Sequence, residues 1–169
     1  MAIIPEKYTS LTPLQEEYRK FWNHFNHLSS NHSEFSSRFK IHPIPSIRSY
    51  QDYSLGEAYI LTMKIDFRKN LFYVSAYFNS VSKYVEYHEN HKSRIEAELG
   101  YELEWKQHTN AGYAKKGFAA DLFDKNQYNQ ICYRMMLEGL KLISVFKKYS
   151  ENRPHDKQTN HSIQRFQNI

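Results

Sequence analysis

The alternation of apolar and polar residues between positions 59 and 78 predicts a β-hairpin. In its first half, apolar residues occupy every second position: Tyr59, Leu61, Met63, Ile65 and Phe67. A second alternating run, 71–78, follows the short turn 68–70. Alternating side chains point to opposite faces of a sheet, and two strands joined by a tight turn are antiparallel. The rest of the chain must therefore cover the apolar face of an antiparallel sheet.

An amphipathic segment near the N-terminus predicts the first covering helix. Thr12 is placed as its N-cap, Pro13 as its first helical residue, and Gln15 as the partner of Thr12 in a capping box. Apolar residues then recur every three or four positions, and the polar run 29–33 ends the pattern. We expect one wide apolar stripe on this helix.

Two more helices follow from the same periodicity. One spans 81–99 and stops at Gly100, a residue type that adopts the left-handed conformation at helix ends. The other spans about 127–149 and carries Gly139 on its apolar face. Because glycine costs a helix about 1 kcal/mol relative to alanine, we expect close contact with a neighbour there to compensate.

Three further strands complete the predicted sheet. The first of these strands spans 46–50, and Pro43 and Pro45 exclude a helix before it. The other two strands span 102–108 and 113–119. The order helix, three strands, helix, two strands, helix predicts an α+β fold. We expect a single five-stranded, mainly antiparallel sheet with three helices on one face.

The chain is divided by this pattern into an N-terminal extension, 1–10, one domain, 11–149, and a polar, flexible C-terminal tail, 150–169. Cys132 is the single cysteine, which excludes a disulfide framework and fits a buried structural thiol in a reducing cytoplasm. Neither a secretory signal nor a membrane-spanning apolar run is present, so we expect no membrane association.

Charge and glycine content narrow the classes of function. The 169 residues carry a formal net charge of +5, from 23 Lys and Arg against 18 Asp and Glu, and the pI is about 9.1. This excess is spread along the chain and permits contact with nucleic acid without demanding it. With five glycines and none of the glycine-rich phosphate-binding motifs, nucleotide-dependent chemistry is disfavoured, and we expect no cofactor.

Two histidines on the second predicted helix, His88 and His91, are weak candidates for metal binding. Zinc needs three or four convergent ligands, and the helical signature H-E-x-x-H fails here because Lys92 occupies its second histidine position. Both histidines lie beside the apolar stripe of the helix. We therefore expect them at the boundary of the core, with no metal.

A strand with the spacing E-x-K resembles the metal-binding strand of some nucleases. Glu104 and Lys106 have this spacing, but magnesium chemistry also needs an aspartate on a neighbouring strand, and Asp66 is the one strand candidate. No complete catalytic constellation is found, so the sequence favours a protein that is not an enzyme. A metal-dependent nuclease stays open as a second alternative.

The sequence supports a binding surface better than it supports a catalytic centre. If the alternate residues of 71–78 face the helices, Tyr73 and Tyr77 point to the opposite face, where Lys64, Lys106 and Lys115 join them if the strand register allows. Aromatic rings among lysines bind single-stranded nucleic acid by base stacking and phosphate contacts. Tyrosines are also common in protein interfaces.

Four segments are similar to a known family. They are the runs Leu71-Phe72, Arg94-Ile95-Glu96-Ala97-Glu98-Leu99-Gly100, Leu103-Glu104-Trp105 and Leu142-Ile143-Ser144-Val145-Phe146. Together with the order of elements, they resemble the bacterial domain of unknown function family 4268 over about residues 11–149. The motif residues look structural, with the glycine capping a helix and the tryptophan entering the core.

The resemblance implies no activity and no catalytic residue, because the family has none established. Its members often carry this module after a nuclease-like domain in restriction or defence-related proteins, and the present chain would be a stand-alone copy. The first hypothesis is therefore a non-catalytic accessory module that binds a protein partner or itself and assists a nucleic-acid-processing partner. The alternative is a domain that binds single-stranded or duplex nucleic acid itself.

Overall fold

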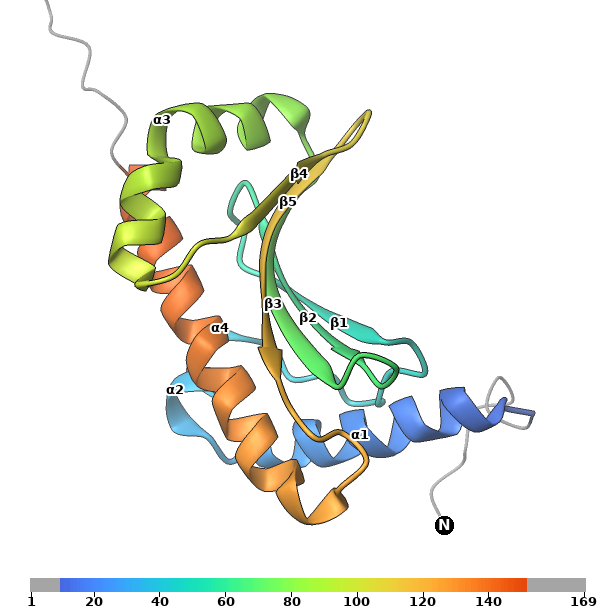
Figure 1. The fold of residues 1–169 in the computed structure, drawn as a ribbon. Coiled ribbons are helices and arrows are strands. Elements are labelled where there is room, and N and C mark those ends of the chain that lie inside the picture. Colours follow the sequence, from blue (N-terminus) through green and yellow to red (C-terminus); the bar gives the residue numbers. More distant parts are fainter. Residues whose placement is uncertain (1–9, 152–169) are drawn as a thin grey trace, which may run out of the picture.

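A computed structural model describes residues 10–151 of the chain (Figure 1). In chain order the elements are α1 (Pro13–Ser30), α2 (Ser33–Arg38), β1 (Tyr50–Ser54), β2 (Ile60–Asp66), β3 (Leu71–Phe78), α3 (Val81–Leu99), β4 (Glu104–Gln107), β5 (Gly112–Ala119), the short 3-10 helix η2 (Lys125–Gln127) and α4 (Tyr128–Glu151). The strands form one antiparallel sheet in the order β1-β2-β3-β5-β4. The predicted α+β class, the five-stranded sheet and the order of the elements are confirmed.

The N-terminus of α1 has the predicted capping box. The Gln15 backbone N–H donates to Thr12 Oγ1 over 3.2 Å, and the Thr12 N–H donates to Gln15 Oε1 over 3.0 Å. The helix buries Phe21, Trp22 and Phe25 completely. These aromatic residues bring α1 against α4 and the β1 end of the sheet.

The two predicted glycine positions behave as expected. Gly100 ends α3 with φ at 79°, in the left-handed region. At Gly139 on α4, a Cβ atom would lie 2.4 Å from Met63 Cε and 3.3 Å from a Leu61 methyl carbon. The absence of a side chain at this position therefore lets α4 pack directly on β2.

Alternation along the central strands separates the two faces of the sheet. On β2 and β3 the helix-facing residues are all fully buried: Leu61, Met63, Ile65, Phe72, Val74, Ala76 and Phe78. Cys132 of α4 is also fully buried, and burial raises the pKa of its thiol, as expected for a structural cysteine. Figure 1 shows the long helices on this side of the sheet.

The family-like motif joins α3 to its surroundings. Glu96 Oε1 accepts hydrogen bonds from the Leu103 N–H over 2.9 Å and from the Trp105 indole N–H over 3.0 Å. Glu98 accepts a hydrogen bond from Tyr149 Oη over 2.6 Å, which ties α3 to α4. Trp105 is half-buried and packs against the core. The motif thus has a structural role, as its residues suggested.

Between α1 and β2 one predicted strand is misplaced and one helix was missed. The first strand lies at Tyr50–Ser54 rather than 46–50. Ser46 forms a turn in which its Oγ donates to the Tyr50 carbonyl and accepts from the Arg48 N–H, both over 3.0 Å, so this segment is not available as a strand. The helix α2 was not predicted; it has six residues and one buried apolar side chain, Phe35, which leave no periodicity to detect.

The predicted N-terminal extension, 1–10, and C-terminal tail, 150–169, lie outside the described residues apart from Ser10, Ser150 and Glu151. The last two belong to α4, so this helix runs beyond the predicted domain boundary at 149. Within residues 10–151, none of the helices is long and apolar enough to cross a membrane.

Candidate binding surface on the open face of the sheet

The strand register places the five predicted surface residues on one face. Lys64 of β2 is opposite Tyr73 of β3, and Tyr77 is opposite Tyr113 of β5. Tyr113 is in turn opposite Lys106 of β4, while Lys115 is opposite Ser75, between the two tyrosines of β3. Directly paired side chains share a face, so this register satisfies the condition on which the predicted surface depended.

We call this surface the open face. Its side chains are those of Tyr50, Asp52, Ser54, Ile60, Thr62, Lys64, Asp66, Leu71, Tyr73, Ser75, Tyr77, Glu104, Lys106, Tyr113, Lys115 and Ala119. Figure 1 shows α3 and α4 on the opposite side of the sheet, and no helix of the described residues lies over the open face. Lys64 and Lys106 are exposed, and Tyr73 and Tyr77 are half-buried.

Lys115 of β5 lies between two aromatic rings of the open face. Its ammonium is 5.0 Å from the centroid of Tyr73 and 4.9 Å from that of Tyr113, and it forms a 3.3 Å ion pair with Glu104. Burial by itself lowers the pKa of Lys115, but its contacts with Tyr113 and Glu104 outweigh this effect, so the pKa is raised above its ordinary value. Lys115 is therefore a cation held in place.

The hydroxyl of Tyr113 completes this network. It donates a hydrogen bond of 3.1 Å to Glu104 Oε1. Burial, and then this hydrogen bond to a carboxylate, raise the pKa of Tyr113, so it stays a neutral donor. Glu104 thus contacts both Lys115 and Tyr113 on the part of the open face formed by β4 and β5.

The ring of Tyr73 lies flat over a glycine. A Cβ atom at Gly117, its partner on β5, would be 2.9 Å from Tyr73 Cε1. The missing side chain lets the ring rest on the β5 backbone, an arrangement that fixes an aromatic ring on a sheet surface. Tyr73 is accordingly held between the strand below it and Lys115 beside it.

Three groups of the open face have no partner within the described residues. The Tyr77 side chain makes no ring contact and no hydrogen bond there, and the ammonium groups of Lys64 and Lys106 make no ion pair or cation–π contact. One aromatic ring and two cations are thus available to a ligand. Tyr77 and Lys64 are separated on this face by the cross-strand pair of Thr62 and Ser75.

Sequence reasoning missed the part of this surface near β1. The Arg48 guanidinium lies 5.9 Å from the centroid of the Tyr50 ring and donates a hydrogen bond of 3.0 Å to Tyr50 Oη. A hollow of about 440 Å³ beside β1 is lined by both residues and by Asp52. Tyr50 ended the predicted strand 46–50 but was not assigned to a face, and Tyr113 could have been found from its alternation with Lys115.

The two histidines of α3 lie in aromatic surroundings. The His88 ring stacks 5.6 Å from Tyr84 and meets Trp105 edge-on at 5.4 Å, while the His91 ring is 5.0 Å from that of Tyr149. Residues 10–151 contain no group of three or more His, Cys, Asp or Glu side chains arranged to hold a metal ion.

The residues weighed for a nuclease site are far apart. Asp66 lies on β2 and Glu104 and Lys106 on β4, with β3 and β5 between those strands. Three strand spacings of about 4.8 Å separate them laterally. Asp66 instead accepts hydrogen bonds from the N–H groups of Arg68 and Lys69 in the turn, over 3.0 and 3.2 Å. Asp66 therefore does not lie beside Glu104, as a magnesium site of this kind would need.

Comparisons of the chain with protein-family models, with curated proteins and with solved structures found no significant match. The resemblance to family 4268 stays a prediction. The function must therefore be argued from the residues of the open face.

Proposed function

We propose that the protein is a non-catalytic module that binds single-stranded nucleic acid on the open face. The observation that supports this most strongly is the convergence of Lys64, Lys106 and Lys115 with Tyr73 and Tyr77 on a face that no described helix covers. Phosphates would be held by the lysines and a base would stack on a tyrosine.

The division of labour follows from which groups are free. Lys64 and Lys106 would contact phosphates, because both are exposed and neither has an ion-pair partner within the described residues. Tyr77 would stack on a base, since its ring makes no ring–ring or cation–π contact within the described residues, although Tyr113 is its cross-strand partner. Tyr73 has Lys115 beside it and would contribute contact area and a fixed ring edge.

The composition of the face favours nucleic acid over a protein partner. Lysine is depleted in protein interfaces relative to other surfaces, whereas lysines beside exposed aromatic rings are typical of single-strand binding platforms. Nucleic acid is therefore the better-supported occupant, although the sequence by itself favoured a protein. The protein partner suggested by the family resemblance, a restriction- or defence-related enzyme of the cytoplasm, would be bound elsewhere on the molecule.

The experiment is a titration of the full chain into fluorescein-labelled oligo(dT), oligo(U) and a duplex, followed by anisotropy at two salt concentrations. We expect saturable binding to the single strands that weakens with salt. Each phosphate contact of a single strand contributes a slope of roughly 0.7 in log K against log salt. Equal or tighter binding of the duplex, or no binding at low salt, would overturn the proposal.

Lysine variants connect the binding to the open face. The double variant Lys64→Gln, Lys106→Gln should lower the salt slope by roughly 1.4, which corresponds to two lost phosphate contacts. Lys125→Gln, which removes an exposed charge on η2 away from the sheet, is the matched control and should leave the slope unchanged. A fall of roughly 0.7 in the Lys125 variant, half that of the double variant, would show that net charge alone governs binding.

A further inference from the structure

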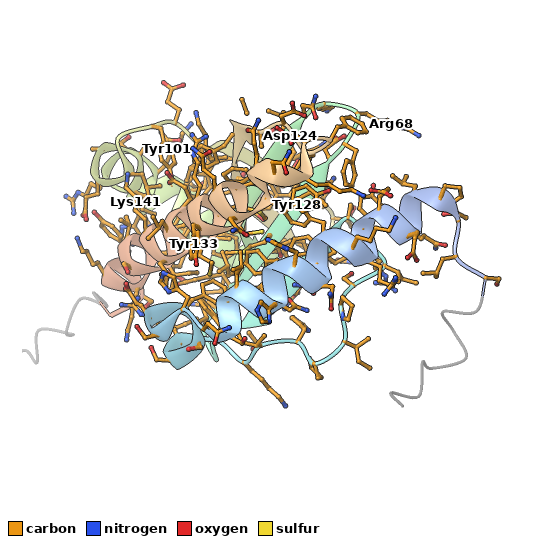
Figure 2. All side chains as sticks on the ribbon, turned by 90° about the horizontal axis from the view of Figure 1, so that it is seen from below. Arg68, Tyr101, Asp124, Tyr128, Tyr133 and Lys141 are labelled. Carbon is orange, nitrogen blue, oxygen red and sulfur yellow. The ribbon has the colours of Figure 1, made fainter. Side chains whose placement is uncertain are left out.

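The outward side of α4 exposes two large apolar side chains. Tyr133 is 44% exposed and Leu137 is 57% exposed. They are four residues apart, so they lie one above the other on the helix, and Lys141 continues the same row. Figure 2 shows Tyr133 and Lys141 along α4, with Tyr101 beside Lys141. Such a row on a surface helix is typical of a contact with another segment.

Two lysines lie over Tyr101 next to this row, and an arginine lies over the neighbouring ring of Phe118. The ammonium groups of Lys116 and Lys141 lie 5.4 and 5.1 Å from the Tyr101 ring centroid, and the Arg134 guanidinium lies 5.0 Å from that of Phe118. We call Lys116, Arg134 and Lys141 the basic cluster. None of the three forms an ion pair within residues 10–151. Each lies against an aromatic ring, and Arg134 and Lys141 also donate hydrogen bonds to backbone carbonyls.

The carboxylate of Glu138 contacts Tyr101, the ring against which two lysines of the basic cluster lie. Glu138 accepts a 3.1 Å hydrogen bond from Tyr101 Oη. Burial, followed by the charge of Glu138, raises the pKa of Tyr101, so its hydroxyl stays protonated. Three cations beside one anion leave an excess of positive charge directly next to Leu137.

We infer that this side of α4 is a docking surface for an acidic amphipathic segment of a protein partner. Tyr133 and Leu137 would contact its apolar side chains, and the basic cluster would pair with its carboxylates. A nucleic acid fits this surface less well than the open face. The accessible aliphatic side chain of Leu137 has no counterpart in a phosphate backbone, and the Tyr101 ring is already covered by two lysines.

The test uses ¹⁵N-labelled full-length protein and a synthetic helical peptide with leucines at i, i+3 and i+4 spacing and glutamates beside them. We expect amide shift changes along α4 around Leu137 and at Lys116, with smaller ones on the open face. A peptide with glutamine in place of every glutamate should bind at least tenfold more weakly. Oligo(dT) should leave the α4 amides unchanged.

Two variants and a control separate docking from folding. Leu137→Ser and Lys116→Gln should each weaken peptide binding several-fold. Leu14→Ser, which removes another exposed leucine, 42% exposed on α1, should have no effect. Shift changes confined to other surfaces, equal binding of the glutamine peptide, or oligo(dT) shifting the same amides would each overturn the inference. Because the oligonucleotide and the peptide are read separately, this inference can fail while the open-face proposal stands, and the reverse.

Discussion

Lys64 on β2 and Tyr73 on β3 are direct cross-strand partners on the face of the sheet opposite the helices. They stand 9 positions apart in sequence and meet because the turn between them closes a regular antiparallel hairpin. The register then continues across β5 and β4, which places Lys115 and Lys106 on the same face. A cation and an aromatic ring are thus neighbours on the open face as a consequence of strand pairing.

Tyr77→Ala should weaken binding of oligo(dT) by about tenfold, because loss of one base–aromatic stack costs about 1–3 kcal/mol. Anisotropy titration measures the change. Tyr133→Ala removes another partly exposed tyrosine, on α4, and serves as the control with unchanged affinity. Unaltered affinity of the Tyr77 variant would exclude stacking on this ring.

Glu104→Gln should tighten binding of single strands several-fold. The substitution frees Lys115 from its 3.3 Å ion pair and removes a negative charge from the open face. An ion pair with an exposed carboxylate contributes about 0–1 kcal/mol to stability, so unfolding by urea should change little. Glu102→Gln removes the same charge from an exposed position outside the strands and is the matched control. Weaker binding by the Glu104 variant would contradict the assigned role of Lys115.

Gly112→Ala should destabilise the fold by about 1–3 kcal/mol, the usual cost of overpacking a filled site. A Cβ atom there would lie 2.4 Å from Tyr84 Cδ2 and 2.5 Å from Tyr84 Cγ, near the root of a buried ring that cannot move aside freely. Urea unfolding followed by circular dichroism measures the loss. An unchanged midpoint would mean that α3 does not press on β5 at this point.

Glu98 should titrate below its ordinary pKa of 4.5 in the folded protein, because Lys148 and then Tyr149 hydrogen-bond to its carboxylate. A lowered pKa favours folding at pH values above 4.5, and this contribution is lost as the pH falls through the folded pKa. Carboxyl ¹³C NMR measures the midpoint. Tyr149→Phe should raise it, and a midpoint at or above 4.5 in the unmodified protein would contradict the observed contacts.

The regular elements could be predicted because their patterns are local. α3 was predicted with both of its ends, since Ser80 precedes its apolar stripe as the N-cap and Gly100 terminates it. The strand β3 was also predicted with both of its ends from alternation. In these segments the residues that face the core are all apolar or aromatic. The spacing of apolar residues in the sequence therefore matches the spacing of buried residues in the structure.

The strand β1 was misplaced because one of its inward residues is polar. Gln51 is 3% exposed, and its Nε2 donates over 2.9 Å to Asn26 Oδ1 and to Tyr53 Oη. This buried polar network interrupts the apolar alternation. Asn26 is 25 residues away in sequence, so no local pattern reveals that Gln51 is satisfied inside the core.

The composition of the open face could be predicted, but its internal pairing could not. Alternation was enough to place Tyr73 and Tyr77 opposite the helices. That Glu104 pairs with Lys115 depends on the register of β4 with β5, which the loop between them determines. Glu104 was considered as a metal ligand, and in the structure it orients a lysine and a tyrosine.

The most direct test of the central claim is to map oligo(dT) on the ¹⁵N-labelled full-length protein by amide shift changes. The account predicts that the changes lie on the open face, at and beside Lys64, Tyr77, Lys106 and Lys115, and that they disappear in the Lys64→Gln, Lys106→Gln, Tyr77→Ala triple variant. Changes confined to α4, or a triple variant that binds like the unmodified protein, would contradict it.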